Sequence, residues 1–530
     1  MTLGGAFRLG GWGLAGGAQA VSLAWPWSWG WPQGEPVPGL QVLAMAALVV
    51  AVQSAPSAWA SVWRGWVFAT AWLIGTFWWL FVSMHTYGGM APPLAGLAVL
   101  ALALALGVYY AAAAGLCWHW RSAPWWARVL VFAACWTLAE WARGTWFTGF
   151  PWGAVGYAQV DALAWLAPYV GVYGLGALAA GMAVLLASAA LQLWQGRARW
   201  GALLVMGAVF TVLLPSVGRG WAEAWPEHTR SAGLLHATLL QGNIPQNEKF
   251  EAQAGVPLAL TWYAQQVRAA VAAPLPADGV GLVVAPETAI PVLPQDVSPA
   301  YWQDLRDAVA QGRSAVMLGL PLGSWTEGYT NSVVSWAPDG PEHRYDKHHL
   351  VPFGEFVPPL FRWFVELMHI PLGDFRRGTL GQSPFAWAGQ RMAPNVCYED
   401  LFGEELAVSF RDAAQAPTVL VNVSNIAWFG DTIAIDQHRH ISRMRALELQ
   451  RPMLRATNTG ATAAIDHRGR VLAELPRLTR DALRVEVDGR AGLTPYARWA
   501  GRWGLWPLVA ACAALLLALL PMAVRRRELK

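Results

Sequence analysis

The chain has 530 residues, of which 55% are hydrophobic and only 13% charged, and its mean hydropathy is +0.33. These values argue against an ordinary soluble protein and indicate a membrane protein. The net charge is +4 and the polar part of the chain has no basic block, so the sequence gives no support to nucleic-acid binding.

Residues 1 to about 217 form apolar runs separated by short breaks, and one more apolar run lies near the C-terminus. Each run is close to the ~20 residues that cross ~30 Å of hydrocarbon as a helix. We expect spans near 7–24, 38–54, 65–84, 92–116, 127–147, 165–193, 199–216 and 504–523. The first run lacks a small-residue cleavage site at the usual place, so we expect it to be retained. The sequence thus predicts a transmembrane domain at 1–217, a polar domain at 230–492 and a C-terminal transmembrane helix.

The arginine bias of the loops sets the expected orientation in the membrane. Arginines occupy alternate loops and the C-terminus: Arg64, Arg121, Arg128, Arg197, Arg199 and Arg525 to Arg527. The intervening loops, "AWPWSWGWPQGEPVPG" and "MHTYGGMAPP", have no Lys or Arg, and Arg143 is the one exception to the pattern. Because basic loops stay in the cytoplasm, we expect both termini inside and residues 230–492 outside.

The polar segment 230–492 alternates strand-like and helix-like stretches. Helical patterns at 257–272, 299–312, 403–413 and 434–449 lie between runs rich in Val, Leu and Ile. Examples of these runs are "GVGLVVAPE", "TNSVVSWAP", "RMAPNVCYED" and "PTVLVNVSN". The alternation predicts an α/β domain.

Three residues with suitable chemistry follow strands of this domain, where α/β folds tend to carry function. Glu287 follows "LVVAP", Lys347 follows "SVVSWAPDGPEHRYD" and Cys397 follows "RMAPNV". A nucleophilic cysteine needs a base to take its proton, and the apolar flanks of Glu287 favour that role. Lys347, one of three lysines among 37 basic residues, can hold the charge on a carbonyl oxygen.

Each of the three also has a structural alternative. A lone cysteine after a strand is more often a buried packing residue. Glu287 can be an ion-pair partner, and Lys347 can lie on the surface. Taken separately, none of them indicates catalysis.

Taken together, the motifs resemble those of the nitrilase, or carbon–nitrogen hydrolase, superfamily. The matching stretches are "VVAPETAIP", "YDKHHLVPFGEFVP" and "NVCYEDLFGE". The whole chain, with "RGTWFTGFPWGAVGY", "QGNIPQNEKF" and "NVSNIAWFG", resembles the bacterial apolipoprotein N-acyltransferase family. This resemblance implies a four-layer α-β-β-α sandwich carried on an eight-helix transmembrane domain in the cell inner membrane. It also implies a periplasmic catalytic domain with Glu287, Lys347 and Cys397 as the triad.

The resemblance implies a two-step acyl transfer that needs no cofactor and no metal. Glu287 deprotonates Cys397, and the thiolate attacks the sn-1 ester of phosphatidylethanolamine. Lys347 and a backbone N–H near Tyr398 stabilise the oxyanion. The thioester then acylates the free amino group of the S-diacylglyceryl cysteine of an apolipoprotein, which is the last step of lipoprotein maturation. We expect a monomer whose partners are the membrane, the phospholipid and the apolipoprotein.

Further residues are expected to support this reaction. Glu355 is expected to orient Lys347 or the attacking amine, with a loop salt bridge as its alternative. Tyr398 and Glu399 are expected to shape the pocket, and Glu399 can equally be structural.

Three aromatic residues are candidates for lipid contacts. Trp152 in "TGFPWG" is expected near the route of lipid access, and Phe250 stands where the family usually has Trp. Trp363 belongs to an apolar stretch, Val357–Gly378, that we expect to dip into the outer leaflet as a mobile arm. Ordinary packing against the domain is the alternative for this stretch.

Two other functions compete with acyl transfer. A membrane-tethered nitrilase-type amidase would use water as the acceptor, and the triad alone does not separate it from a transferase. The eight expected spans favour a lipid donor. A non-enzymatic receptor or assembly protein with a degenerate domain is the second alternative, and the intact Glu–Lys–Cys set argues against it.

Overall fold

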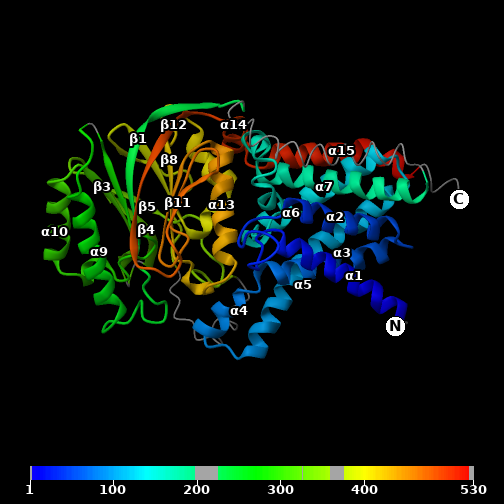
Figure 1. Ribbon diagram of the computed structural model, residues 1–530, viewed down its shortest axis with the longest axis horizontal. Helices are drawn as coiled ribbons and strands as arrows, with labels where there is room; N and C mark the ends of the chain where they lie inside the picture. The colour runs from blue at the N-terminus through cyan, green and yellow to red at the C-terminus, as the bar shows by residue number, and fades with distance from the viewer. Residues whose placement is uncertain are drawn as a thin grey trace. The chain divides into compact units, whose positions relative to one another are not determined.

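The computed structural model describes residues 3–196, 225–277, 279–324, 326, 328–358 and 375–524 (Figure 1). The chain divides into two units. The helical unit comprises Met1–Leu80, Pro92–Pro226 and Trp503–Lys530. The sheet unit comprises Glu227–Arg502 together with Phe81–Ala91, a short segment from the N-terminal part of the chain.

The helical unit contains the apolar runs of the sequence. Its longer helices are α1 (Leu3–Val21), α2 (Pro38–Gln53), α3 (Ala58–Phe77), α5 (Pro92–Cys117), α6 (Trp125–Thr145), α7 (Ala167–Trp194) and α15 (Trp506–Val524). In the described part of the chain, three helical stretches are long and apolar enough to cross a membrane, or four if one bent pair counts as a single span. The expected span at 199–216 lies outside the described residues, and the count of eight stays a prediction.

Small residues let α3 and α5 pack closely. A Cβ added to Gly65 would lie 2.5 Å from the Cβ of Ala114, and Ser61 Oγ donates to the Ala114 carbonyl at 2.8 Å. Such contacts between small residues are typical of helix pairs in membranes.

Arg143, the exception to the arginine pattern, is a buried structural residue. One of its Nη atoms donates to the carbonyls of Phe150 and Trp152 at 2.7 and 2.8 Å, and Nε donates to the Tyr110 hydroxyl at 2.8 Å. The guanidinium therefore satisfies backbone carbonyls of the loop after α6, which explains a charge at this place.

The sheet unit is built from two six-stranded sheets, as the alternating pattern predicted. The first has the order β12–β1–β2–β3–β4–β5 and the second β11–β10–β9–β8–β7–β6. The strands of the first are β1 (Thr229–Gln241), β2 (Gly281–Val284), β3 (Ser314–Ser324), β4 (Gly328–Trp336), β5 (His343–Asp346) and β12 (Asp481–Gly492). Those of the second are β6 (Phe385–Trp387), β7 (Gln390–Val396), β8 (Val419–Ser424), β9 (Met453–Thr457), β10 (Ala463–Ile465) and β11 (Val471–Glu474). β1–β2–β3 and β7–β8–β9 run parallel.

Helices accompany both sheets. The sheet unit contains α9 (Gly255–Val271), α10 (Pro299–Ala310), α12 (Gly403–Leu406), α13 (Ala434–Leu449) and α14 (Pro495–Trp503). The expected helices at 257–272, 299–312 and 434–449 coincide with α9, α10 and α13. The expected helix at 403–413 is only α12 followed by a 3₁₀ turn, Ala407–Phe410.

Three apolar cores hold the sheet unit together. One joins the facing sides of the two sheets, a second joins the first sheet to α9 and α10, and a third joins the second sheet to α13 and α14. Figure 1 shows α9 and α10 on one side of the sheets and α13 on the other. These observations support a nitrilase-like domain with two sheets, while its exact four-layer arrangement stays a prediction.

Candidate active site

The candidate triad lies where three strands end. Glu287 follows β2, Lys347 follows β5 and Cys397 follows β7. Lys347 Nζ is 3.6 Å from Glu287 Oε1 and 2.9 Å from Glu355 Oε1. The facing sheets bring these residues into one cluster, because β2 and β5 belong to the first sheet and β7 to the second. Glu287 and Lys347 are buried, and Cys397 is partly exposed.

Cys397 begins a tight turn at the end of β7. Its φ is +52°, an uncommon value for a residue other than glycine, and the chain continues as a 3₁₀ turn, Cys397–Leu401. Burial and the Glu287 carboxylate raise the pKa of the Cys397 thiol to about 12, although the Lys347 ammonium and the Ser424 hydroxyl act in the opposite direction. The resting cysteine is thus a neutral thiol at neutral pH, and it needs a base to become a nucleophile.

Lys347 is a permanent cation within the cluster. Its side chain is almost completely shielded from solvent. Burial favours the neutral amine, but the carboxylates of Glu355 and Glu287 outweigh it and raise the pKa of Lys347 above its ordinary value. A fixed ammonium in a site of low dielectric is suited to stabilise an oxyanion.

An asparagine connects the two carboxylates. Asn331 Nδ2, on β4, lies 2.7 Å from Oε1 of both Glu287 and Glu355. The other oxygen of Glu287 accepts from the Asn425 backbone N–H at 2.8 Å, and that of Glu355 accepts from the Val351 N–H at 2.8 Å. Both carboxylates are therefore held in one orientation beside Lys347.

Lys249 is a second buried amine at the site. Its Nζ donates to the backbone carbonyl of Glu287 at 3.2 Å, and the residue is 1% exposed. Burial lowers the pKa of Lys249 to about 8, although Glu287 and Cys397 act in the opposite direction. Neither Lys249 nor Asn331 was predicted from the sequence as a site residue. Lys249 carried a usable signal, because it is another of the three lysines.

Two family models match the chain. The carbon–nitrogen hydrolase model matches residues 236–496, and the model of the apolipoprotein N-acyltransferase N-terminal domain matches residues 20–185. The apolipoprotein N-acyltransferase of Verminephrobacter eiseniae is 53% identical, over 93% of this chain and 93% of that protein. The chain belongs to the apolipoprotein N-acyltransferase family.

Other curated members of the apolipoprotein N-acyltransferase family agree over nearly the full length. The protein of Ralstonia nicotianae is 46% identical, over 92% of this chain and 90% of that protein. The protein of Bordetella bronchiseptica is 41% identical, over 97% of this chain and 96% of that protein. The chain is therefore an acyltransferase enzyme, and the non-enzymatic alternative is excluded.

The motif residues after Cys397 differ in their surroundings. Tyr398 is buried and packs edge-on against Phe402, with ring centroids 5.3 Å apart. Glu399 accepts bonds from the Tyr345 hydroxyl at 2.9 Å and from the backbone N–H of Val396 at 2.6 Å. These contacts connect the ends of β5 and β7, which favours the structural alternative for Glu399.

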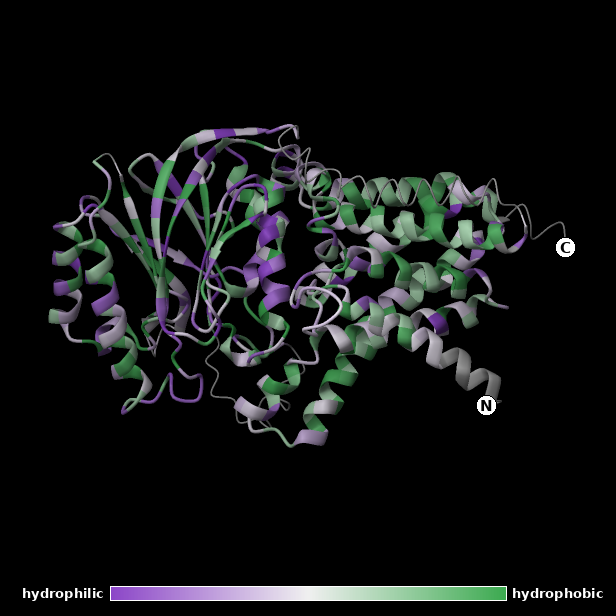
Figure 2. Ribbon diagram, viewed as in Figure 1, coloured by the Kyte–Doolittle hydropathy of each residue, from purple (hydrophilic) through white to green (hydrophobic). Residues whose placement is uncertain are grey.

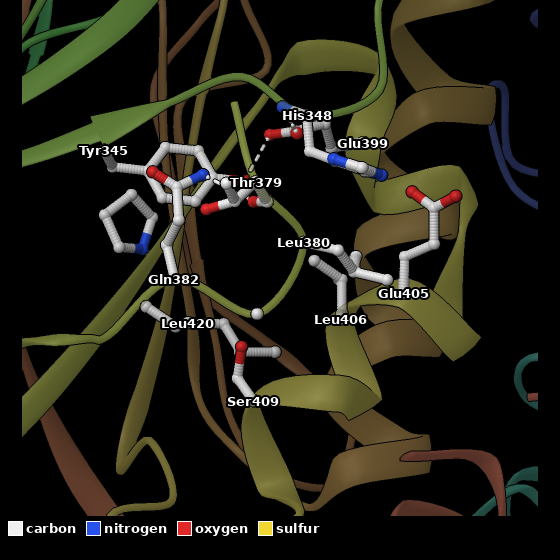
Figure 3. Close-up of a pocket in the computed structure, with 13 residues that line it drawn as sticks. Tyr345, His348, Thr379, Leu380, Gln382, Glu399, Glu405, Leu406, Ser409 and Leu420 are labelled. Atoms are coloured by element: carbon white, nitrogen blue, oxygen red, sulfur yellow. Dashed lines mark hydrogen bonds between the residues drawn. The ribbon is translucent and has the colours of Figure 1, made fainter. Parts of the chain in front are cut away.

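A narrow cavity lies beside Glu399 (Figure 3). It has a volume of about 30 Å³ and is lined by Tyr345, His348 and Leu420, among others. In Figure 3 the Tyr345 hydroxyl donates a hydrogen bond to Glu399 at one end of this cavity. A cavity needs about 10–15 Å³ by this measure to hold one water molecule, so this cavity has room for water and not for an acyl chain.

The three aromatic candidates lie in different places. Trp152 belongs to the helical unit, where it is 3% exposed and packs against Trp79 with ring centroids 4.8 Å apart. Phe250 lies in the sheet unit next to Lys249 and is 55% exposed. Trp363 and residues 359–374 of the expected arm lie outside the described residues, so the arm stays a prediction.

Proposed function

We propose that this enzyme transfers an acyl chain from a membrane phospholipid to the N-terminal amino group of apolipoproteins, through a thioester on Cys397. The observation that carries the proposal is the position of Lys347, buried between Glu287 and Glu355. Lys347 also acts on the thiol of Cys397, so a base, a nucleophile and a fixed cation share one site. Membership in the family supports apolipoproteins as acceptors.

In the first half-reaction, Glu287 takes the thiol proton and the sulfur of Cys397 bonds to the ester carbonyl carbon. The carbonyl oxygen becomes an oxyanion, which Lys347 and the Tyr398 N–H stabilise. The ester C–O bond then breaks. The proton on Glu287 passes to the departing lysophospholipid oxygen, and the acyl chain remains as a thioester.

In the second half-reaction, the amine of the diacylglyceryl cysteine attacks the thioester and gives a proton to Glu287. A C–N bond forms, the C–S bond breaks, and the thiolate of Cys397 takes the proton back. The thioester preserves the acyl-transfer potential of the ester, so neither a cofactor nor ATP is needed. This order is a ping-pong mechanism.

The proposal includes the setting of the reaction. The donor is phosphatidylethanolamine, cleaved at sn-1, and the enzyme is a monomer in the inner membrane with its catalytic domain in the periplasm. The apolar helices of the helical unit support membrane integration. The absence of Lys and Arg from alternate loops supports the orientation.

Intact-mass analysis of the purified enzyme mixed with phosphatidylethanolamine tests the thioester. We expect a mass gain of one acyl chain, which hydroxylamine removes. Cys397→Ala should show no adduct, whereas Cys512→Ala, a matched change at a buried cysteine of the helical unit, should still form it. If the unmodified enzyme forms no adduct, or forms one that Cys397→Ala retains, the mechanism is wrong.

A further inference from the structure

On the face of β8 that is turned toward α13, a polar side chain lies next to the backbone of Cys397. The valines of β8 belong to the core between the sheets, whereas Leu420 packs in the core on the α13 side. Because side chains alternate along a strand, Asn422 shares the face of Leu420. α13 is almost wholly buried, yet it is strongly hydrophilic (purple in Figure 2). Buried polar side chains therefore lie between the second sheet and α13, next to the apolar core that contains Leu420.

The carbonyl oxygen of Cys397 points into this layer. Asn422 Nδ2 donates to it at 3.2 Å, and His438 Nε2 of α13 lies 3.2 Å from it. Both side chains are essentially unexposed, at 0% and 1%. Asn422 Nδ2 also donates to Asn395 Oδ1 at 2.7 Å, and the Cys397 carbonyl takes its second hydrogen. Rotating the carbonyl would leave one buried N–H of Asn422 without an acceptor and would remove the contact with His438, so these contacts favour its present direction.

Arg455 determines which ring nitrogen of His438 carries the proton. A guanidinium can only donate, and Arg455 Nη2 lies 3.1 Å from His438 Nδ1, so Nδ1 accepts and Nε2 carries the hydrogen. The same Nε2–H is 2.9 Å from Asp400 Oδ1. Asp400 accepts in turn from Ser442, and Arg455 Nη1 is 3.4 Å from its other oxygen. The Nε2–H of His438 is thus shared between the Asp400 carboxylate and the Cys397 carbonyl.

Fixing the carbonyl also fixes the next N–H. The six atoms of a trans peptide are coplanar, and the N–H points opposite to the C=O. We propose that His438 and Asn422 are positioning residues, which hold the Cys397–Tyr398 peptide so that the Tyr398 N–H faces the reacting carbonyl oxygen of the acyl donor. The inference rests on the proposed function and adds the means by which the enzyme orients an oxyanion donor.

This role predicts different effects on two reactions of the same sulfur atom. Acylation by phosphatidylethanolamine passes through an oxyanion and needs the oriented N–H. Alkylation by iodoacetamide displaces iodide at a saturated carbon and forms no oxyanion. A residue that positions the peptide should therefore affect acylation alone, whereas a residue that only supports the fold or the thiol should affect both reactions.

The experiment compares both rates in the full-length enzyme and in two variants, His438→Phe and Asn422→Leu. Removing one oxyanion donor slows catalysis by roughly 10²- to 10³-fold, so we expect acylation to fall about 10²-fold while alkylation changes by less than about 2-fold. His438→Gln, which keeps a side-chain N–H donor, should recover part of the acylation rate. His440→Phe is the matched control, because His440 lies on the same helix, is equally buried and bonds to Arg443.

The possible outcomes separate this inference from the proposed function. If the unmodified enzyme forms no thioester, the proposed function fails and the positioning role fails with it. If the thioester forms at the same rate in His438→Phe as in the unmodified enzyme, only the positioning role is overturned. Parallel losses of acylation and alkylation also overturn it. If His438→Phe does not fold, Asn422→Leu carries the same test.

Discussion

At the scale of single residues, Lys347 has a setting that suits an ammonium. It lies between Glu287 and Glu355 without solvent contact, and one bond of 2.9 Å fixes its Nζ. A guanidinium is planar, larger and spreads its charge over three nitrogens. We expect Lys347→Arg to slow acylation of Cys397 by about 10²-fold or more, measured by intact mass over time.

The same substitution elsewhere is the control for this prediction. Lys530 is at the C-terminus, outside the described residues, and Lys530→Arg should leave acylation unchanged. Full activity of Lys347→Arg would show that the site needs only a positive charge and not a compact one.

Glu355 adds negative charge near both Lys347 and Cys397. Its carboxylate is among the groups that raise the pKa of the Cys397 thiol. In Glu355→Gln this charge is absent, so the thiolate is less disfavoured and the thiol pKa should fall. We expect the pH profile of Cys397 alkylation by iodoacetamide to move to lower pH, while acylation slows because Lys347 loses its nearest partner.

Glu342→Gln is a suitable comparison, because Glu342 is an exposed carboxylate paired with Arg306. Its alkylation profile should match that of the unmodified enzyme. A profile of Glu355→Gln that stays in place or moves to higher pH would contradict the electrostatic role of Glu355.

At the scale of elements, the residues of the candidate triad lie in the loops and turns that directly follow three strands. Motifs around Glu287, Lys347 and Cys397 are local in sequence, so their positions after strands could be predicted. Asn331 could not, because its bonds to Glu287 and Glu355 depend on β4 lying beside β5 in the first sheet. Neighbours of this kind are set by strand order, which a single sequence does not reveal.

In the helical unit, Arg143 holds the loop after α6 by hydrogen bonds, as Asn331 holds the two carboxylates of the sheet unit. Its Nε donates to the Tyr110 hydroxyl while one Nη donates to the carbonyls of Phe150 and Trp152, so separate nitrogens of the guanidinium are used. Lysine has no such fork. We expect Arg143→Lys to destabilise the protein by about 2–3 kcal/mol, since a hydrogen bond to a charged group contributes about 1.5–3 kcal/mol.

Thermal unfolding in detergent measures this effect as a lower midpoint. Arg121→Lys is the control, because Arg121 is partly exposed and stacks over Trp118, where its loss should matter little. Equal midpoints for Arg143→Lys and the unmodified protein would show that the loop does not depend on the guanidinium.

At the scale of the whole molecule, composition predicted a membrane protein but not a secure count of spans. α2 has only 16 residues, and α6 carries Arg128, Glu140 and Arg143 within its length. α1 is diluted by glycines and Arg8. These helices lie at the expected positions, but they are shorter or less apolar than a helix that crosses a membrane alone. Such helices are tolerated in a bundle, because neighbouring helices can satisfy their polar groups.

In the proposed reaction the acyl chain moves from Cys397 to an apolipoprotein amine and not to water. A single-turnover experiment decides between the two acceptors: the isolated acyl-enzyme is mixed with an S-diacylglyceryl cysteinyl peptide. We predict that the peptide gains one acyl chain in amide linkage, while the enzyme returns to its original mass. Release of free fatty acid with the peptide unchanged would identify a hydrolase and contradict the account.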